Sequence, residues 1–201
     1  MNADTLLGII EMRRSVRRFR PEPVPDALLA RLLRAAIWAP SAHNRQPWRF
    51  VVVQAPAARS RLVEMMAARW RADLAADGLS DEAIARQVSR SRGRLGGAPA
   101  LIVVCMTVAD MDSYPDARRQ ANERVMAIQS VAMAGQNLLL MAHAEGLGAC
   151  WMCAPLFCPD VVRTALDLPD DWEAVGAVVL GYPAEERTKD RYPLETRVLW
   201  R

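Results

Sequence analysis

The sequence predicts a single domain in which helices cover both faces of a buried β-sheet. The chain has 201 residues, which is enough for one well-packed domain and short for two. Segments of strand character alternate with helical segments, and residues 100–106 form an unbroken apolar run. A strand that lacks polar alternation is buried on both faces, so this run is expected to be a central strand. We therefore expect residues 1–201 to form one domain.

The first half of the chain contains three helical segments and one strand. The helices are expected at residues 4–14, 26–38 and 56–95, the last of them broken at 77–80. Asp4 and Ser80 are the residues expected to cap the first helix and the helix after the break. A β-branched segment at 49–54 is expected to form a buried strand.

The second half contains the remaining strands and a long helix. Strands are expected at residues 100–106, 149–152 and 172–181, and helices at 119–145 and 159–168. The long helix is apolar on more than one face, so we expect it to lie deep in the core. The last 20 residues are extended and charged, and then apolar again at 198–200. A segment of this kind is expected to wrap around a partner subunit.

The composition is that of an ordinary globular protein. Hydrophobic residues make up 52% and charged residues 24%, and the net charge of +3 is too small to argue for nucleic acid. No apolar run reaches the roughly 18–20 residues needed to span a bilayer. The N-terminus has no charged-then-apolar signal pattern. We expect a cytoplasmic protein with neither membrane nor nucleic acid as a partner.

Four cysteines leave two interpretations open. Cys150 and Cys153 form a C-x-x-C pair, which occurs in redox dithiols and as half of a zinc site. The chain has no second such pair and only two histidines, His43 and His143. The pattern favours reduced cysteines that act as small apolar residues, and no metal site is predicted.

A short basic segment stands out near the N-terminus. Residues 13–19 contain four arginines and one serine and end at Phe19. Guanidinium forks and a hydroxyl are donors that fit phosphate oxygens. Val16, Phe19 and the apolar residues at 6–12 are expected to attach this segment to the core. We interpret it as a clamp for phosphate or another multivalent anion, with a solvated basic face as the alternative.

No hydrolytic motif accompanies this clamp. The chain contains no G-x-S-x-G, no P-loop and no G-x-G-x-x-G after a strand. His143 falls in the long helix, where a structural role is more common, whereas His43 falls in the polar loop 41–48 and is a candidate to line a site. The absence of an acid–base set suits an enzyme whose chemistry belongs to a bound cofactor. The clamp, the loop 41–46 and an apolar core would together bind a flat heterocycle with a phosphate tail.

Four motifs resemble the FMN-dependent nitroreductase family. They are RRSVRRF at 13–19, APSAHNRQPWRF at 39–50, GLGACW at 146–151 and LGYP at 180–183. Their order and spacing match over essentially the whole chain. The resemblance implies an α+β three-layer sandwich, with a central, mostly antiparallel sheet flanked by helices. It also implies a homodimer that exchanges its C-terminal extension and builds two FMN sites at its interface.

The resemblance also implies a set of cofactor contacts. The residues concerned are Arg13, Arg14, Ser15, Arg17, Ser41, Asn44, Met152 and Arg191. The first four are expected to hold the phosphate and ribityl chain, and Arg17 also to place positive charge near the pyrimidine end of the flavin. Ser41 and Asn44 are expected to reach FMN from the other subunit. The backbone of 150–154 is expected to pass over one flavin face, and Arg191, with Lys189 as a helper, to contact the phosphate. No catalytic acid or base is assigned.

A narrower resemblance points to one branch of the family. Residues 70–79, 113–118 and 168–173 look like the C-terminal FMN domain of the two-domain glutamyl ligase of the deazaflavin coenzyme F-420. That domain is associated with reducing a dehydro precursor of the coenzyme. Under this reading Asp73 is a candidate substrate contact.

The activity implied by the family is a ping-pong oxidoreduction. NAD(P)H or a similar reductant delivers hydride to flavin N5, and an electron-poor acceptor then takes the electrons. The alternatives are reduction of the coenzyme F-420 precursor, a flavin-binding module without turnover, and a flavin-destroying or dehalogenating member of the fold. The sequence leaves open the acceptor, the choice between NADH, NADPH and reduced deazaflavin, and whether residues 60–95 form a fixed wall or a mobile lid.

Overall fold

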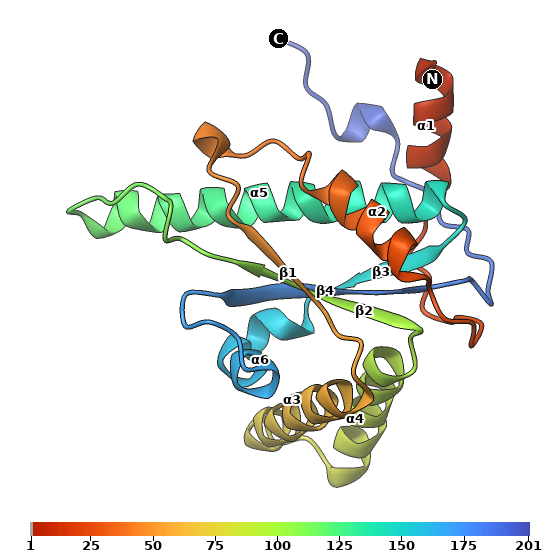
Figure 1. The fold of residues 1–201 in the computed structure, drawn as a ribbon, viewed down its shortest axis with the longest axis vertical. Helices are drawn as coiled ribbons and strands as arrows, with labels where there is room; N and C mark the ends of the chain where they lie inside the picture. The colour runs from red at the N-terminus through yellow and green to blue at the C-terminus, as the bar shows by residue number, and fades with distance from the viewer. Residues whose placement is uncertain (1) are drawn as a thin grey trace.

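Four antiparallel strands form one sheet at the centre of the structure, a computed structural model that describes residues 2–201 (Figure 1). The strands are β1 (Trp48–Val52), β2 (Ala100–Met106), β3 (Gly148–Met152) and β4 (Glu173–Gly181). Their order across the sheet is β1-β2-β4-β3, and every pairing between these strands is antiparallel. The apolar run 100–106 therefore is a central strand, as predicted.

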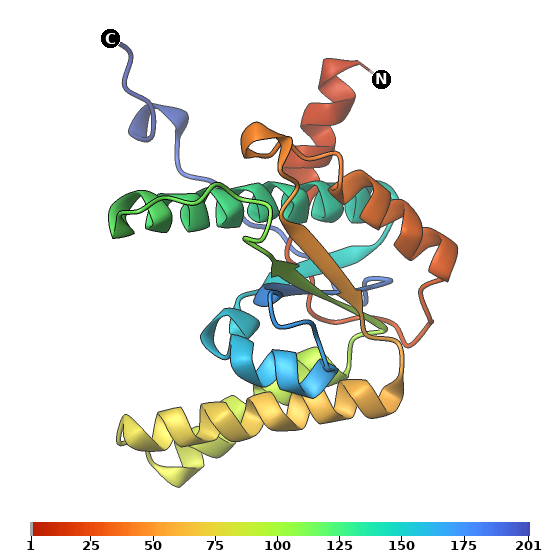
Figure 2. The ribbon, with the colours of Figure 1, turned by 60° about the vertical axis from the view of Figure 1, so that its left-hand side comes forward.

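Helices cover both faces of this sheet and complete three layers. One face carries α2 (Asp26–Ala36) and α5 (Ala117–Ala144), and the other carries α3 (Pro56–Ala76), α4 (Asp81–Gly96) and α6 (Pro159–Leu166). Figures 1 and 2 show α1 (Ala3–Met12) on the α5 side, above the end of that helix. The expected α+β three-layer sandwich is confirmed.

The two faces of β2 explain why both helical layers are needed. All seven residues of β2 are buried. Ile102 and Val104 belong to the core under α2 and α5, whereas Leu101 and Val103 belong to the core above α3 and α6. Each such side chain contributes about 1.5–3 kcal/mol when it is fully buried. An uncovered face of β2 would lose that contribution at every second residue.

Of the two predicted helix caps, the structure confirms Ser80 and contradicts Asp4. Ser80 caps α4, where its hydroxyl accepts a hydrogen bond from the Ala83 N–H at 3.4 Å, as expected. Asp4 is the wrong cap for the first helix, because α1 already begins at Ala3. The side chain of Asn2 accepts the hydrogen bond from the Thr5 N–H at 2.9 Å. Asp4 instead lies in the first turn, where its charge favours the helix dipole.

The long helix α5 is less deeply buried than its composition predicts. An 18-residue window of α5 has a mean hydropathy of 1.4, which by length and composition alone would suit a membrane span, but only 44% of it is buried. The inner side of α5 packs on β2 and α2 through residues such as Val131 and Leu138. Val125 and Met133 on its outer side are 49% and 40% exposed. The extra apolar side chains of α5 thus form a surface rather than more core.

Two glycines make room for Trp151 between the sheet and α5. A Cβ atom added to Gly135 of α5 would lie 2.5 Å from the Trp151 ring, and one added to Gly176 of β4 would overlap the same ring. Trp151 is on β3 and packs against the α5-side core. The indole therefore occupies the space that side chains at these two positions would need.

The basic segment is attached to the free edge of β3. The Val16 N–H donates to the Ala149 carbonyl at 3.1 Å, and Ser15 pairs with Ala149 in parallel. Val16 is buried and touches Gly148, where an added Cβ would lie 2.7 Å from it. Phe19 pairs with Pro183 beyond the end of β4. The predicted attachment of this segment to the core is confirmed for Val16 and Phe19. It is wrong for the apolar residues at 6–12, because α1 has no buried residue and Leu7 and Met12 are 52% and 68% exposed.

Glu185 fixes the C-terminal segment to the basic segment. Its carboxylate accepts hydrogen bonds from the Arg17 N–H and from the Arg187 guanidinium, both at 2.9 Å. Burial raises the pKa of the Glu185 carboxyl, but these hydrogen bonds outweigh burial, so the net shift of the pKa is downward. The Glu185 side chain is 12% exposed. Beyond it, residues 186–201 are exposed, and only Leu194–Thr196 forms a short 3-10 turn.

We expect Gly135→Ala to destabilise the protein. The added methyl overlaps the Trp151 ring, and overpacking of this kind costs about 1–3 kcal/mol. Gly93→Ala is the matched control, because Gly93 lies in α4 with nothing within 4 Å of an added Cβ. That change should stabilise by up to about 1 kcal/mol through helix propensity. Urea unfolding of both variants measures the difference, and equal shifts would contradict the packing of Trp151 described above.

We expect Glu185→Gln to weaken folding only where the carboxyl is ionised. A group whose pKa is lowered on folding stabilises the protein above its unfolded pKa of about 4.3, and this contribution is lost as the pH falls through the folded value. The variant should lose about 1–2 kcal/mol near neutral pH and little in acid.

Urea unfolding at several pH values measures this profile. Glu22→Gln is the control, because Glu22 is 53% exposed and only meets Arg20 at 3.4 Å. That variant should follow the parent closely. An equal loss for Glu185→Gln at acidic and neutral pH would show that shape rather than charge anchors the segment.

Candidate functional site

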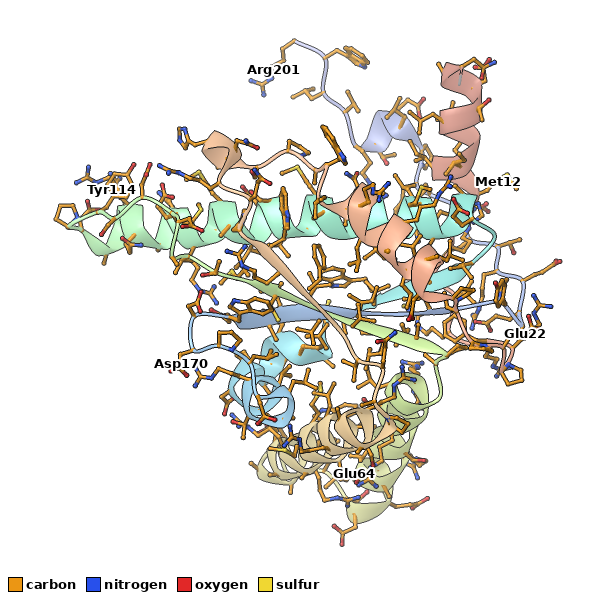
Figure 3. The ribbon with its side chains drawn as sticks, in the orientation of Figure 1. Met12, Glu22, Glu64, Tyr114, Asp170 and Arg201 are labelled. Carbon is orange, nitrogen blue, oxygen red and sulfur yellow. The ribbon has the colours of Figure 1, made fainter. Side chains whose placement is uncertain are left out.

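Arginines gather where the basic segment, the start of β3 and the C-terminal segment meet. Figure 3 labels Met12, the last residue of α1, and the basic segment begins immediately after it. Burial, then Arg191, then Arg14 lower the pKa of Arg13, and Cys150 of β3 acts on it in the opposite sense. The mutual effect places Arg13, Arg14 and Arg191 in one neighbourhood. We call Arg13, Arg14, Arg17 and Arg191 the arginine cluster.

No acidic side chain neutralises the arginine cluster among the described residues 2–201. The ion pairs nearby use Arg18 and Arg187, which both pair with Glu185. Arg14 and Arg17 instead donate to backbone carbonyls, to that of Arg13 at 2.9 Å and to that of Ser15 at 3.5 Å. The Arg14 Nε is buried without a hydrogen-bond partner in this part of the chain. Arg13, Arg14 and Arg191, which act on one another without an acidic partner in this part of the chain, fit a multivalent anion such as a phosphate group, and Arg17 follows them on the same segment.

His143 also lies in this neighbourhood, although its position in the long helix favours a structural role. It lies in the last turn of α5. Burial, then Arg13 and Arg14, lower its pKa. An imidazole kept neutral can donate one hydrogen bond to an anion without adding charge. Its sequence position carried no signal of this, because only the packing of α5 beside β3 brings it near Arg13.

The polar loop 41–46 has an unusual backbone conformation. His43, Asn44 and Gln46 have φ angles of 49°, 55° and 52°, in the left-handed region that non-glycine residues rarely adopt. The Ser41 hydroxyl accepts from the Gln46 N–H at 3.0 Å and so stabilises the turn. Arg45 pairs with Asp112 at 2.5 Å and ties the loop to the connection before α5. Strained loops of this kind are concentrated at ligand sites.

The loop and the arginine cluster do not meet within one chain. Figure 1 shows the 3-10 turn Ala42–Asn44 above the N-terminal half of α5, while α1 and the start of the basic segment lie at the other end of that helix. Ser41 and Asn44 are therefore separated from the other expected cofactor contacts in this single subunit. Ser15 and Arg17, in contrast, lie beside β3 with Arg13.

Met152 and Asp73 meet at a separate cavity on the other side of the sheet. This α3–α4 cavity has a volume of about 540 Å³ and is bounded by α3, α4 and the connection from β3 to α6. Met152, the last residue of β3, lines it together with Asp73 of α3. Asp73 is 54% exposed and pairs with Arg69 at 3.7 Å. The structure thus brings the expected substrate contact to one of the expected cofactor contacts, Met152.

The arginines of α4 divide into two groups. Arg86 pairs with Glu82 at 2.5 Å, and Arg92 pairs with Glu64 of α3. Arg90 and Arg94 line the α3–α4 cavity instead. Arg86, Arg90 and Arg94 follow one another at intervals of four residues and share one side of α4. The two groups therefore differ in their neighbours rather than in their helical spacing.

The cysteines are unpaired and lie apart from any metal-binding group within residues 2–201. Cys105, Cys150 and Cys158 are buried and Cys153 is exposed. Burial raises the pKa of the Cys105 thiol to about 12, which keeps it protonated. No group of three histidine, cysteine or acidic side chains gathers in this range. The three buried thiols pack as small apolar residues of the core.

Comparison with known sequences identifies the relatives of this chain. The model of the nitroreductase family matches residues 10–182. A protein of Thermus thermophilus named NADH dehydrogenase is 34% identical, over 94% of this chain and 92% of its own length. The 5,6-dimethylbenzimidazole synthase of Rhodospirillum rubrum is 36% identical, over 91% of this chain and 84% of its own length.

Solved structures agree with this relationship. A nitroreductase-type protein of Desulfovibrio desulfuricans, crystallised in complex with FMN, superimposes with a TM-score of 0.75 at 29% identity and covers 100% of this chain and 98% of its own. An NADH dehydrogenase/NAD(P)H nitroreductase-type structure from Bacteroides thetaiotaomicron gives 0.71 at 28% identity, over 99% and 98% of the two chains. The family match covers residues 10–182, and the two superimposed structures cover 100% and 99% of the chain. The chain belongs to the nitroreductase family.

Proposed function

We propose that the protein is an FMN-dependent oxidoreductase that uses NAD(P)H or a similar reductant to reduce an electron-poor acceptor in the cytoplasm. The observation that carries the proposal is the arginine cluster, which holds four guanidinium groups without an acidic partner within residues 2–201. The FMN phosphate supplies the missing negative charge. Bound FMN contributes the redox chemistry, taking a hydride from NAD(P)H at N5 and returning two electrons to the acceptor.

The protein's own residues position the cofactor. Arg13, Arg14 and Arg191 bind the phosphate, and Ser15 and Arg17 face the ribityl chain from the edge of β3. Positive charge near the flavin pyrimidine stabilises the reduced, anionic flavin, a role that suits Arg17. Its backbone N–H donates to the Glu185 carboxylate at 2.9 Å, which holds the main chain at this residue. No general acid or base is required of the protein.

The second half of the cofactor site comes from a second copy of the chain in a homodimer. The loop carrying Ser41 and Asn44 lies away from the arginine cluster within one subunit (Figure 1). The α5 side also exposes apolar side chains on α1, α5 and the C-terminal segment, among them Leu7, Met133 and Trp200, which are 52%, 40% and 85% exposed. Such a surface is covered in an obligate dimer. The C-terminal segment is free to exchange between subunits.

Two specific observations favour second candidate functions. Asp73 lines the α3–α4 cavity with Met152, as expected if the protein reduces a precursor of coenzyme F-420. The relative named 5,6-dimethylbenzimidazole synthase makes a product that corresponds to the dimethylbenzene end of a flavin, which favours a flavin-destroying activity. Product analysis after aerobic turnover separates reduction of an acceptor from consumption of FMN.

We expect Arg13→Gln to weaken FMN binding about tenfold to a hundredfold. One charge-assisted hydrogen bond to a phosphate contributes about 1.5–3 kcal/mol, and Arg13 is the most strongly perturbed arginine of the cluster. Riboflavin lacks the phosphate, so its affinity should stay nearly unchanged. Flavin absorbance and fluorescence titration measure both affinities.

Arg34→Gln is the control for this experiment. Arg34 is exposed on α2 and outside the arginine cluster. It should bind FMN like the parent. Equal weakening of FMN and riboflavin by Arg13→Gln would contradict a phosphate-binding role. A purified protein that stays colourless after incubation with FMN would contradict the proposed function itself.

We expect a hybrid dimer of two defective chains to recover about half of its FMN sites. One chain carries Arg13→Gln and the other carries Ser41→Ala with Asn44→Ala. If each site takes its arginines from one subunit and its loop from the other, the hybrid has one intact site and one doubly defective site. Differently tagged chains allow purification of the hybrid, and FMN per dimer is then measured. Recovery no greater than in the two parent variants would place the loop and the arginines in the same subunit's site.

A further inference from the structure

We propose that the α3–α4 cavity binds the electron acceptor and that Arg90 and Arg94 bind an acidic group of it. The substrate class is an apolar or aromatic acceptor that carries a carboxylate or phosphate at one end. This inference rests on the proposed oxidoreductase function for its redox meaning. It concerns arginines of α4 that lie outside the arginine cluster.

The walls of the cavity are apolar where they lie nearest the sheet. Met66 and Trp70 come from α3, Met152 is the last residue of β3, and Phe157 lies in the connection from β3 to α6. Met66 is 5% exposed, whereas Phe157 is 77% exposed and stands at the rim. A volume of about 540 Å³ accommodates a small aromatic molecule.

The acidic and basic groups of the walls are not equally available. Arg69 is already engaged by Asp73 at 3.7 Å and by Asp160 at 3.1 Å. Arg90 and Arg94 have no acidic partner within residues 2–201, although both line the cavity. The remaining acid of the walls is Asp77. Three arginines against two aspartates leave the lining one charge positive, and the two unengaged arginines carry that excess.

Helix geometry keeps Asp77 away from these arginines. α3 and α4 run antiparallel from the turn at 77–80, so Asp77 lies at the tip of this helical hairpin (Figure 2). Arg90 and Arg94 follow the first residue of α4 by about 14 and 20 Å along the helix axis. Asp77 therefore lies at the open tip, and Arg94 lies toward the sheet.

The sequence of α4 places the two guanidinium groups side by side. Arg90 and Arg94 are four residues apart and share one face with Gln87, next to the buried stripe of Ile84, Val88 and Leu95. The buried stripe fixes the rotation of α4 and hence the direction of this face. Two neighbouring guanidinium groups offer several donors to one anion. The like charges of Arg90 and Arg94, four residues apart, destabilise α4 when no ligand is bound. An anion bound between them removes this repulsion.

Met152 connects this cavity to the proposed cofactor site. It is the last residue of β3, whose first residues carry the basic segment. An acceptor whose ring lies against Trp70 and whose acidic group meets Arg90 and Arg94 extends toward the end of β3. Binding of the acceptor's acidic group to the two arginines then determines how far its reducible group extends into the cavity toward Met152.

The test compares acceptors that differ in charge alone. We expect the double variant Arg90→Gln/Arg94→Gln to raise the KM for 4-nitrobenzoate about tenfold and to leave the KM for 4-nitrobenzamide within about twofold. Arg86→Gln is the matched control, because Arg86 lies on α4 outside the cavity and pairs with Glu82. It should change neither value. Equal effects on both acceptors would overturn the proposal.

The ratio of kcat/KM for NADPH to kcat/KM for NADH should be the same in the double variant as in the parent protein. A fall in this ratio with unchanged discrimination between acceptors would overturn the proposal, because the arginines would then bind the phosphate of the reductant. An unchanged ratio together with the selective change for 4-nitrobenzoate supports it.

A binding measurement separates this inference from the proposed function. Calorimetry with 2-naphthoate and 2-naphthamide needs no turnover and works with or without FMN. The parent protein should bind the naphthoate at least about tenfold more tightly, and the double variant should not. If the protein bound no flavin yet showed this selectivity, the proposed function would fail and the anion site would stand. Equal binding of both compounds by the parent would overturn the anion site alone.

Discussion

Burial of β2 on both faces is the constraint on which the rest of the structure depends. A strand whose seven residues are all buried needs a helical layer on each side. The α2–α5 layer and the α3–α4–α6 layer meet this need, and they also sort the functional groups. The proposed dimer surface lies on the α5 side, and the α3–α4 cavity lies on the opposite side. β3, at the edge of the sheet, is the element that touches both.

The edge position of β3 explains how one short strand serves two sites. An uncovered edge presents unpaired N–H and carbonyl groups, and the basic segment covers it through the Val16–Ala149 hydrogen bond. The arginine cluster is therefore fixed by sheet pairing rather than by ion pairs of its own. Because no acidic side chain within residues 2–201 pairs with a guanidinium group of the cluster, the cluster costs stability in the empty protein. That cost is expected at a site whose missing charge belongs to a ligand.

The sequence predicts what depends on local pattern. The central strand at 100–106 and the helix cap at Ser80 are predicted correctly, because burial on both faces and helix capping each depend on a sequence pattern of a few neighbouring residues. The resemblance to the nitroreductase family also predicts the three-layer fold correctly. Asp4 failed as a cap because helix starts shift by one or two residues at little cost. The depth of α5 was overestimated because an apolar face has the same composition whether it meets the core or a second subunit.

The site residues that the sequence missed depend on packing between distant elements. His143 gains its role only where α5 ends beside the basic segment, 130 residues from Arg13 in the chain. Arg90 and Arg94 differ from Arg86 and Arg92 in their neighbours, because only the packing of α3 against α4 forms the cavity that Arg90 and Arg94 line. Glu82 of α4 pairs with Arg86, and Glu64 of α3 pairs with Arg92. Arg90 and Arg94 line the cavity and have no acidic partner within residues 2–201. Arginines without an acidic partner within residues 2–201, rather than arginines as such, are thus the property that both proposed sites share.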